Sequence, residues 1–263
     1  MSVPEVPQGA LSIAGVVRAW WGENRRQRGF LSTARDFASR VLEFVRESFP
    51  DRKRQRYGDI DFDWDYRVDT TCANVGWRDR LLGMFLSPYQ ATEPAFFHEM
   101  FQALAIDFSQ FTFIDLGSGK GRTLLMAADY PFRRIVGLEL VPTLHAAAVK
   151  NIEIYKSENR RCFAVESICA DARQFVFPPE PTVLYLFNPL PPEGLAKVVA
   201  NLEKSLDEHP RVLYVLYHNP SLERILVGNH TLKRVSGTHQ YVIYVAETQQ
   251  VPGLTPERDE NGV

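Results

Sequence analysis

From residue 93 onward, hydrophobic residues fall into two patterns that alternate along the chain. Short and nearly continuous apolar runs are typical of strands that are covered on both faces. Between these runs lie longer segments whose apolar residues recur three or four positions apart, as on one face of a helix. The predicted strands are 111–116, 134–139, 165–170, 183–187 and 212–217. The predicted helices are 94–104, 121–129, 142–155, 193–206 and 222–227. This alternation predicts parallel βαβ units.

The end of this region departs from the alternation. Residues 232–235 and 241–245 are two apolar strands joined by a turn that contains Gly237, so we expect an antiparallel pair at one edge. The expected fold is therefore α/β, with a seven-stranded, mostly parallel sheet, helices on both faces and an antiparallel edge strand. We place this domain at residues 93–250 and expect a disordered polar tail at 251–263.

The N-terminal part of the chain predicts a helical extension. Residues 10–49 show helical periodicity, and the clearest helix is expected to begin at Thr33 as N-cap and to end before Pro50. The apolar stripe of this helix is formed by Phe37, Val41, Phe44 and Val45. We expect the stripe to pack on the main domain while the basic face stays solvated. Docking of a substrate by this arm is the alternative.

Aspartate occupies every second position in the segment that follows, at Asp59, Asp61, Asp63 and Asp65. A calcium loop of the EF-hand type needs Gly at its sixth position and Glu at its twelfth, where this chain has Trp64 and Thr70. We therefore exclude an EF-hand. The alternation instead predicts an extended segment whose apolar side is formed by Ile60, Phe62, Trp64 and Tyr66. The segment belongs to a connector or cap at residues 57–92.

Composition limits the functional classes further. The 263-residue chain is 45% hydrophobic and 24% charged, which suffices for a packed core and excludes a disordered chain. No apolar run reaches the roughly 18 residues of a membrane-spanning helix. The three cysteines form no C-x-x-C pair, which argues against a disulfide framework or zinc site and favours a cytoplasmic protein. Because the histidines lack metal-ligand spacing, we expect no metal.

The net charge of −2 conceals an asymmetry along the chain. Residues 1–56 hold 11 Lys and Arg against 6 Asp and Glu, whereas the other residues hold 19 against 26. A basic helical arm at 1–56 therefore precedes an acidic body. An acidic body favours cationic partners over a phosphate backbone.

The most informative motif follows the first strand of the domain and reads Asp115-Leu116-Gly117-Ser118-Gly119-Lys120-Gly121. Glycines let the backbone approach a ligand closely, and the next helix offers free N–H groups. A P-loop is excluded because Ile114 stands where its first glycine belongs and Gly121 where its Ser or Thr belongs. A dinucleotide fingerprint fails because Arg122 replaces its last glycine. An acid followed by G-x-G-x-G remains. We expect Lys120 and Arg122 to be solvated surface groups, and an anion site is the alternative.

Together with acids after the next two strands, Glu139 and Asp171, this motif resembles motif I of class I S-adenosylmethionine-dependent methyltransferases. The resemblance covers about residues 89–246 and implies a Rossmann-like fold with S-adenosylmethionine as cofactor. It implies that Asp115 contacts the methionine amino group, Glu139 the ribose hydroxyls and Asp171 the adenine amino group. The other cofactor-binding residues that it implies are Gly117, Ser118, Gly119 and Thr92.

The segment after the fourth strand, Asn188-Pro189-Leu190-Pro191, resembles the [DNS]-P-P-[YFW] motif of methyltransferases that act on amino groups. In that motif a side-chain carbonyl and a backbone carbonyl accept the hydrogens of the amine, which implies catalytic roles for Asn188 and Pro189. Leu190 replaces the second proline and Pro191 replaces the aromatic residue, so a stacking platform for a flipped base is missing. A tight turn between strand and helix is the alternative.

The segment before the glycine-rich motif, Pro88-Tyr89-Gln90-Ala91-Thr92-Glu93, resembles the corresponding segment of non-SET protein-lysine methyltransferases. The resemblance implies that Tyr89 and Thr92 fold over the methionine end of the cofactor, with Tyr89 taking part in catalysis. Packing or capping is the alternative for both. His218, after the fifth strand, is suited to general-base chemistry, but we favour a structural role at the rim of the sheet.

The expected function is S-adenosylmethionine-dependent methyl transfer to a nitrogen, with a protein lysine as the leading acceptor. A small-molecule amine or hydroxyl is the second acceptor, and nucleic acid is third because the body is acidic. A non-catalytic module that binds S-adenosylmethionine is the competing class. We expect no membrane association, and the sequence predicts no oligomeric state.

Overall fold

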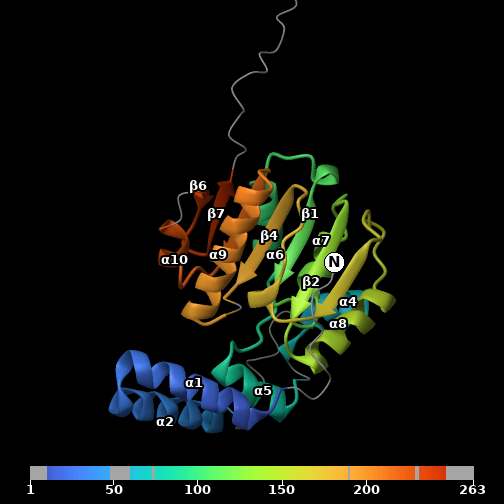
Figure 1. Cartoon of the computed structure of the whole chain (residues 1–263). Helices are drawn as coiled ribbons and strands as arrows, with labels where there is room; N and C mark the ends of the chain where they lie inside the picture. Colours follow the sequence, from blue (N-terminus) through green and yellow to red (C-terminus); the bar gives the residue numbers. More distant parts are fainter. Residues whose placement is uncertain (1–10, 48–59, 73–74, 189, 229–230, 247–263) are drawn as a thin grey trace, which may run out of the picture.

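The computed structural model describes residues 11–47, 60–72, 75–188, 190–228 and 231–246. Its strands are β1 (Thr112–Leu116), β2 (Arg134–Glu139), β3 (Val165–Cys169), β4 (Thr182–Phe187), β5 (Leu213–His218), β6 (Lys233–Gly237) and β7 (Tyr241–Ala246). They form one seven-stranded sheet in the order β3-β2-β1-β4-β5-β7-β6 (Figure 1). Strands β1 to β5 are parallel, whereas β7 is antiparallel to β5 and β6 is antiparallel to β7. The predicted α/β fold with an antiparallel edge is confirmed.

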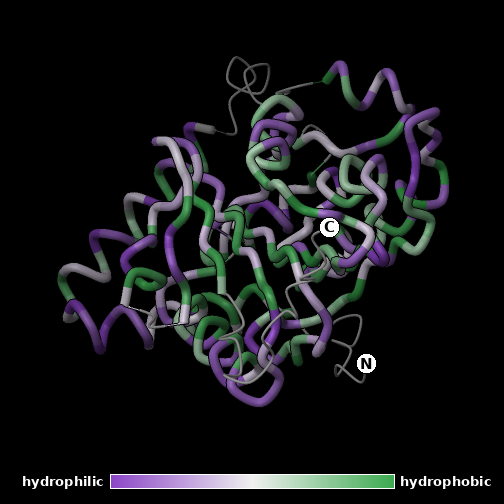
Figure 2. The backbone as a smooth tube through the Cα atoms, turned by 90° about the horizontal axis from the view of Figure 1, so that it is seen from above, coloured by the Kyte–Doolittle hydropathy of each residue, from purple (hydrophilic) through white to green (hydrophobic). Residues whose placement is uncertain are grey.

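Helices cover both faces of this sheet. They are α6 (Pro94–Gln102), α7 (Arg122–Ala127), α8 (Pro142–Ile154), α9 (Pro192–Glu208) and α10 (Arg224–Val227), with a short 3-10 turn η3 (Phe108–Gln110) before β1. Because successive strand residues point to opposite faces, Phe113 and Ile114 of β1 belong to two separate hydrophobic clusters. Phe113 packs in the cluster of Phe97 from α6, and Ile114 packs in the cluster of Leu195 from α9. Hydrophobic residues accordingly concentrate along the central strands (Figure 2).

The N-terminal extension forms two helices, α1 (Ile13–Arg28) and α2 (Phe30–Glu47), which pack with α5 (Trp77–Phe85). Trp20 of α1 and Phe37 of α2 meet Phe85 of α5, with ring centroids 5.3 and 5.7 Å from the Phe85 ring. The three helices lie below the carboxyl ends of the central strands in Figure 1. The arm therefore contacts the main domain through α5 and through α9, where the Gln27 side chain of α1 donates a hydrogen bond to Glu193.

The prediction that Thr33 caps this helix is wrong. Gly29 has a positive φ of 81°, which ends α1 and lets α2 begin at Phe30. Thr33 lies within α2 and donates its hydroxyl to the Gly29 carbonyl at 2.8 Å. Only part of the predicted stripe packs inward, because Val41 and Val45 remain exposed.

The prediction of an extended segment around residues 59–66 is also wrong. Residues Ile60–Tyr66 form helix α4, with Phe62 and Asp63 buried and Trp64 exposed. The Asp63 carboxylate accepts backbone N–H groups from Thr70 and Thr71, at 2.7 and 2.8 Å, and so ties the helix to the loop segment that follows. Alternation of apolar and acidic residues could not indicate this contact.

Some predictions concern residues outside those that the structure describes. These are the end of the basic arm at 48–56, Asp59, the tail 251–263 and Pro189. None of the helices in the described ranges has the length and apolar character needed to cross a bilayer.

Candidate functional site

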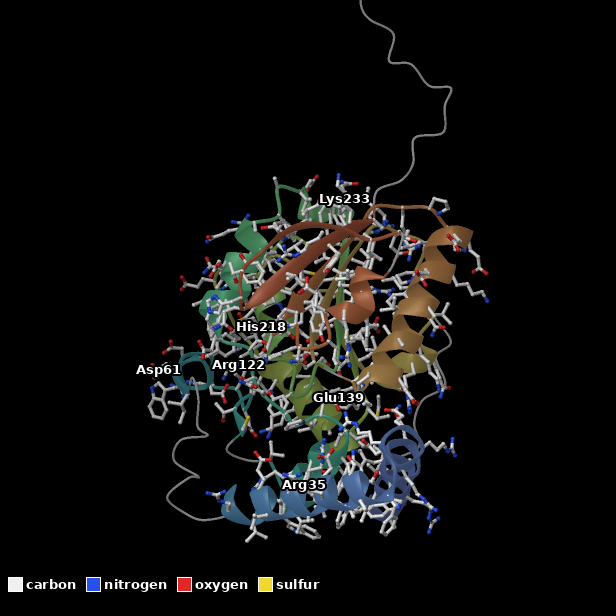
Figure 3. The ribbon with its side chains drawn as sticks, turned by 90° about the vertical axis from the view of Figure 1, so that its left-hand side faces the viewer. Arg35, Asp61, Arg122, Glu139, His218 and Lys233 are labelled. Carbon is white, nitrogen blue, oxygen red and sulfur yellow. The ribbon has the colours of Figure 1, made fainter. Side chains whose placement is uncertain are left out.

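A cavity of about 320 Å³ lies at the carboxyl ends of the parallel strands, next to α5. Ligands bind at this edge in open α/β sheets, and the volume is within the range of small-molecule sites. The predicted site residues that line the cavity are Tyr89, Thr92, Asp115, Gly117, Ser118, Glu139, Asp171 and Asn188. In Figure 3, Glu139 lies between the sheet and the helix that carries Arg35. The structure therefore brings together residues that are up to 99 positions apart in the sequence, from Tyr89 to Asn188.

The glycine-rich loop forms the floor of the cavity beside β1. Gly117 and Gly119 have positive φ angles of 83° and 55°, a conformation that other residues adopt only with strain. Gly119 is not itself a lining residue, because the Tyr89 ring covers it. A Cβ atom at Gly119 would lie 2.1 Å from Cε2 of Tyr89, so glycine is required here for close packing of the ring.

Asp115 is the penultimate residue of β1 and is almost completely buried, with 3% of its surface exposed. Its carboxylate accepts a hydrogen bond from the Thr123 hydroxyl on α7. Burial raises the pKa of Asp115 to about 7, because the charged form loses hydration, while the Thr123 hydrogen bond acts in the opposite direction. A cationic ligand group next to Asp115 would restore the ionised form.

Glu139 ends β2 and binds two backbone groups. One carboxylate oxygen accepts from Gly119 N and the other from Val141 N, both at 2.8 Å. Burial raises the pKa of Glu139 above its ordinary value, although these backbone hydrogen bonds favour the charged form. A carboxylate has about four acceptor positions, so both oxygens keep capacity for ligand hydroxyls.

Asp171 follows β3 and also caps the 3-10 turn η4 (Ala172–Gln174), where its carboxylate accepts Arg173 N at 2.9 Å. Arg173 pairs with the same carboxylate through its side chain, with Nε 2.9 Å from Oδ1. Burial raises the pKa of Asp171, but the hydrogen bonds and charge of Arg173 outweigh burial and hold the pKa below its usual range. The carboxylate is therefore ionised at neutral pH.

These acids lie in a defined order along the rim. Because the sheet order is β3-β2-β1-β4, the polar residues at or just beyond the carboxyl ends of these strands follow one another as Asp171, Glu139, Asp115 and Asn188. The three carboxylates thus line one side of the cavity, and Asn188 stands at the end beyond Asp115.

Asn188 follows β4 in a strained backbone conformation, with a φ of 45°. Its side-chain oxygen accepts hydrogen bonds from the hydroxyls of Tyr217 and Ser221, each at 2.8 Å, and its amide nitrogen donates to the Asn219 carbonyl at 2.6 Å. The side chain is therefore held by β5 and the turn after it. The structure says nothing of the adjacent Pro189.

Tyr89 and Thr92 line the cavity from the segment between α5 and α6. The Tyr89 hydroxyl donates to the Thr70 carbonyl at 2.6 Å, and burial raises the pKa of Tyr89 well above its ordinary value. The Thr92 hydroxyl is 2.8 Å from the Tyr185 hydroxyl, which in turn is 2.8 Å from Nδ1 of His218. Tyr185 lines the cavity and was missed in the sequence, where it is one residue of a buried strand.

His218 is the inner end of this hydrogen-bonded chain. It is buried, and its ring stacks on Phe187 with centroids 4.2 Å apart. Burial lowers the pKa of His218 to about 4, so the imidazole is neutral at physiological pH. Burial and the hydrogen bond between Nδ1 and the Tyr185 hydroxyl disfavour proton uptake by His218 and support the structural role that we favour.

The prediction that Lys120 and Arg122 are solvated is wrong. Both are buried, with 3% and 2% of their surface exposed. Lys120 pairs with Asp69 at 2.8 Å and Arg122 pairs with Asp63 at 3.2 Å. The cavity also has a lining residue from α5, Asp79, that no motif indicated. Across the described ranges, no group of three or more His, Cys, Asp or Glu side chains is arranged to hold a metal ion.

No protein-family model matches this sequence, and no curated protein matches it. Solved structures do match. An RNA methyltransferase from Salinibacter ruber, in complex with S-adenosyl-L-homocysteine, is 24% identical over 64% of this chain and 97% of that chain, with a TM-score of 0.39. The 23S rRNA methyltransferase ErmE is 13% identical over 63% and 72%, with a TM-score of 0.43. A ribosomal protein L11 methylase from Lactobacillus delbrueckii subsp. bulgaricus is 13% identical over 58% and 74%, with a TM-score of 0.39.

The sheet itself supplies the structural features that the sequence resemblance implies. Five parallel strands carry the site residues at their carboxyl ends, and an antiparallel β7 lies next to β5. The glycine-rich loop after β1 opens directly into α7. The chain therefore has the Rossmann-like α/β fold that the sequence resemblance implies.

Proposed function

We propose that this protein is a methyltransferase that uses S-adenosylmethionine and methylates a nitrogen. The observation that carries the proposal is the order of Asp171, Glu139, Asp115 and Asn188 along one rim of one cavity. It matches the order of the parts of the donor, which are adenine, ribose and methionine, followed by the methyl acceptor.

The donor set of the cavity fits this cofactor. Asp171 lies at the adenine end of the rim, and it would accept the adenine amino group once the half-exposed Arg173 side chain releases a carboxylate oxygen. Glu139 keeps acceptor capacity for the two ribose hydroxyls. Asp115, whose charge is disfavoured by burial alone, gains a counter-ion from the amino group of the methionine part. When bound, the cofactor supplies a methyl group on a positively charged sulfur that a nucleophile can attack in line.

The protein's part in the reaction is to position the acceptor and remove water from it. Asn188 is held at the end of the cavity, and one of the two hydroxyls that it accepts, that of Ser221, comes from an exposed residue. Rotation of the Ser221 hydroxyl toward solvent would leave an acceptor position on Asn188 for an amine hydrogen.

A protein lysine is the leading acceptor. Its amine has a pKa near 10.4 in water and must lose a proton before it can attack. Burial beside Tyr185 and Phe187, which line the cavity, would lower that pKa without a catalytic base. A small-molecule amine or hydroxyl would use the same site.

Nucleic acid, which the sequence places third among the acceptors, becomes the second candidate because the helical arm next to the cavity carries exposed cations. Its exposed arginines are Arg18, Arg25, Arg26, Arg28, Arg35 and Arg46. Arginines on a surface next to an active site are suited to phosphate contacts. Two of the similar solved structures are named as methyltransferases of RNA or rRNA.

The test is incubation of the protein with a methyl-labelled donor and a cell lysate, followed by separation into protein, nucleic acid and small molecules. We expect label in the protein fraction with the wild type and none with Asp115→Ala. Label in nucleic acid would make the second candidate correct. If the protein binds the donor but no fraction becomes labelled, the protein is a non-catalytic binding module and not an enzyme.

A further inference from the structure

The aspartates of α4 have no role in the proposed reaction, yet they differ sharply in environment. Asp61 and Asp65 are exposed, whereas Asp63 between them is buried. An ionised carboxylate is costly to bury unless it is paired and hydrogen-bonded, so the burial of Asp63 needs an explanation. It is found in the contacts of Asp63 with residues beside the cavity.

Both carboxylate oxygens of Asp63 accept hydrogen bonds. It accepts N–H groups from Thr70 at 2.7 Å and Thr71 at 2.8 Å, and it also accepts the Thr70 hydroxyl. The Arg122 guanidinium donates to it at 3.2 Å. The carboxylate thus fixes the backbone of residues 70 and 71 against the first residue of α7.

Arg122 completes the arrangement from the side of the glycine-rich loop. Its Nε donates to the Thr70 hydroxyl at 2.7 Å, and its guanidinium carbon lies 4.9 Å from the centre of the Phe62 ring. Arg122 also lines the cavity. Arg122, which directly follows the glycine-rich motif, therefore connects α4 to the cavity.

Thr70 carries the link onward to the cavity wall. Its carbonyl oxygen accepts the Tyr89 hydroxyl at 2.6 Å. The Tyr89 ring in turn packs so closely on Gly119 that a Cβ there would be 2.1 Å from the ring. The position of the aromatic wall over the glycine-rich loop thus depends on where Asp63 holds Thr70.

A second set of hydrogen bonds joins residues 69–71 to the glycine-rich loop. Lys120 donates to Asp69 at 2.8 Å and to the Thr71 carbonyl at 3.0 Å. The Asn151 amide accepts Asp69 N at 3.0 Å and donates to the carbonyls of Asp69 at 2.8 Å and Lys120 at 2.9 Å. Residues 69–71 are therefore held to the loop from both sides.

We propose that Asp63 is a positioning residue for the donor cavity, which acts through Thr70 and Arg122 to hold Tyr89 against Gly119. The proposal rests on the proposed function, since the ligand that Tyr89 would cover is the methionine part of the donor. Asp61 and Asp65 supply matched controls on the same short helix.

The experiment compares Asp63→Asn with Asp61→Asn and Asp65→Asn. The first readout is hydrogen–deuterium exchange of the free protein, over residues 69–71 and 117–122. The second readout is the affinity for S-adenosylhomocysteine by isothermal titration calorimetry. A double-mutant cycle with Tyr89→Phe tests whether the two residues act through one another.

We expect Asp63→Asn to exchange faster in both segments and to bind S-adenosylhomocysteine at least tenfold more weakly, while both controls resemble the wild type. The loss in the double variant with Tyr89→Phe should be smaller than the product of the two single losses. Folded Asp63→Asn with wild-type exchange and affinity, or with losses that multiply, would overturn the proposal.

The experiment distinguishes failure of the proposed function from failure of the role proposed for Asp63. If the wild type itself binds no S-adenosylhomocysteine, the proposed function fails, and the exchange measurement alone decides the role of Asp63. If Asp63→Asn does not fold by circular dichroism, Tyr89→Phe decides: weaker binding with faster exchange at 69–71 supports the link, and wild-type behaviour refutes it.

Discussion

The substitution Asp115→Asn should stabilise the protein and abolish donor binding at the same time. Asp115 has a pKa of about 7 in the folded protein, against 3.8 for an unperturbed carboxyl. At pH 8 the group is ionised in both states, and burial of the charge then costs about 4 kcal/mol at 1.36 kcal/mol per pKa unit. Asparagine has the same shape, can accept the Thr123 hydroxyl and carries no charge to bury.

The stabilisation should depend on pH with a defined sign. The pKa of Asp115 is higher in the folded than in the unfolded protein, so folding favours the protonated carboxyl. Its contribution to stability is complete below about pH 4 and is lost as the pH rises through about 7. At pH 5 the cost is about 2 kcal/mol. The gain from Asp115→Asn should therefore be about 2–3 kcal/mol larger at pH 8 than at pH 5.

Urea unfolding of the wild type and Asp115→Asn at both pH values measures this difference, with Asp61→Asn as an exposed control. Other titrating groups such as His218 are present in both proteins and cancel in the comparison. Calorimetry with S-adenosylhomocysteine should show no binding to the variant. Equal stability differences at pH 5 and pH 8, or retained binding, would refute the description of Asp115 as a buried carboxyl kept for the donor.

Three further outcomes follow from the same contacts. Affinity for S-adenosylhomocysteine should fall about tenfold from pH 8 to pH 6, because protonation of Asp115 removes the counter-ion of the ligand amine, and a flat titration series would contradict this. Thr123→Val should move that profile to higher pH, because the Thr123 hydroxyl lowers the pKa of Asp115 and its removal raises that pKa. An unchanged profile would show that the hydrogen bond is not made. Asn188→Ala should keep the dissociation constant within about twofold and reduce turnover at least about tenfold, with exposed Asn159→Ala as control; equal loss of binding would remove Asn188 from its proposed role.

The strands and the site acids were predictable because each leaves a local signal. A strand buried on both faces is a continuous apolar run, and 134–139 coincides with the observed β2. Acids at the ends of successive parallel strands must meet at one edge of the sheet, so Glu139 and Asp171 could be placed beside the loop without coordinates.

Features that depend on distant partners could not be predicted. Arg122 and Lys120 were expected in solvent because nothing near them in sequence pairs with them. Their partners, Asp63 and Asp69, lie 59 and 51 positions earlier. The alternating segment has the same kind of distant contacts. Asp63 of α4 pairs with Arg122 and accepts the N–H groups of Thr70 and Thr71, and the local residue pattern indicates none of these partners.

The binding of S-adenosylhomocysteine to the full chain, measured by isothermal titration calorimetry at pH 8, tests the central claim most directly. The account predicts one molecule bound per chain, with no binding to Asp115→Ala. Absence of binding to the wild type, together with thermal stabilisation by NAD instead, would contradict it.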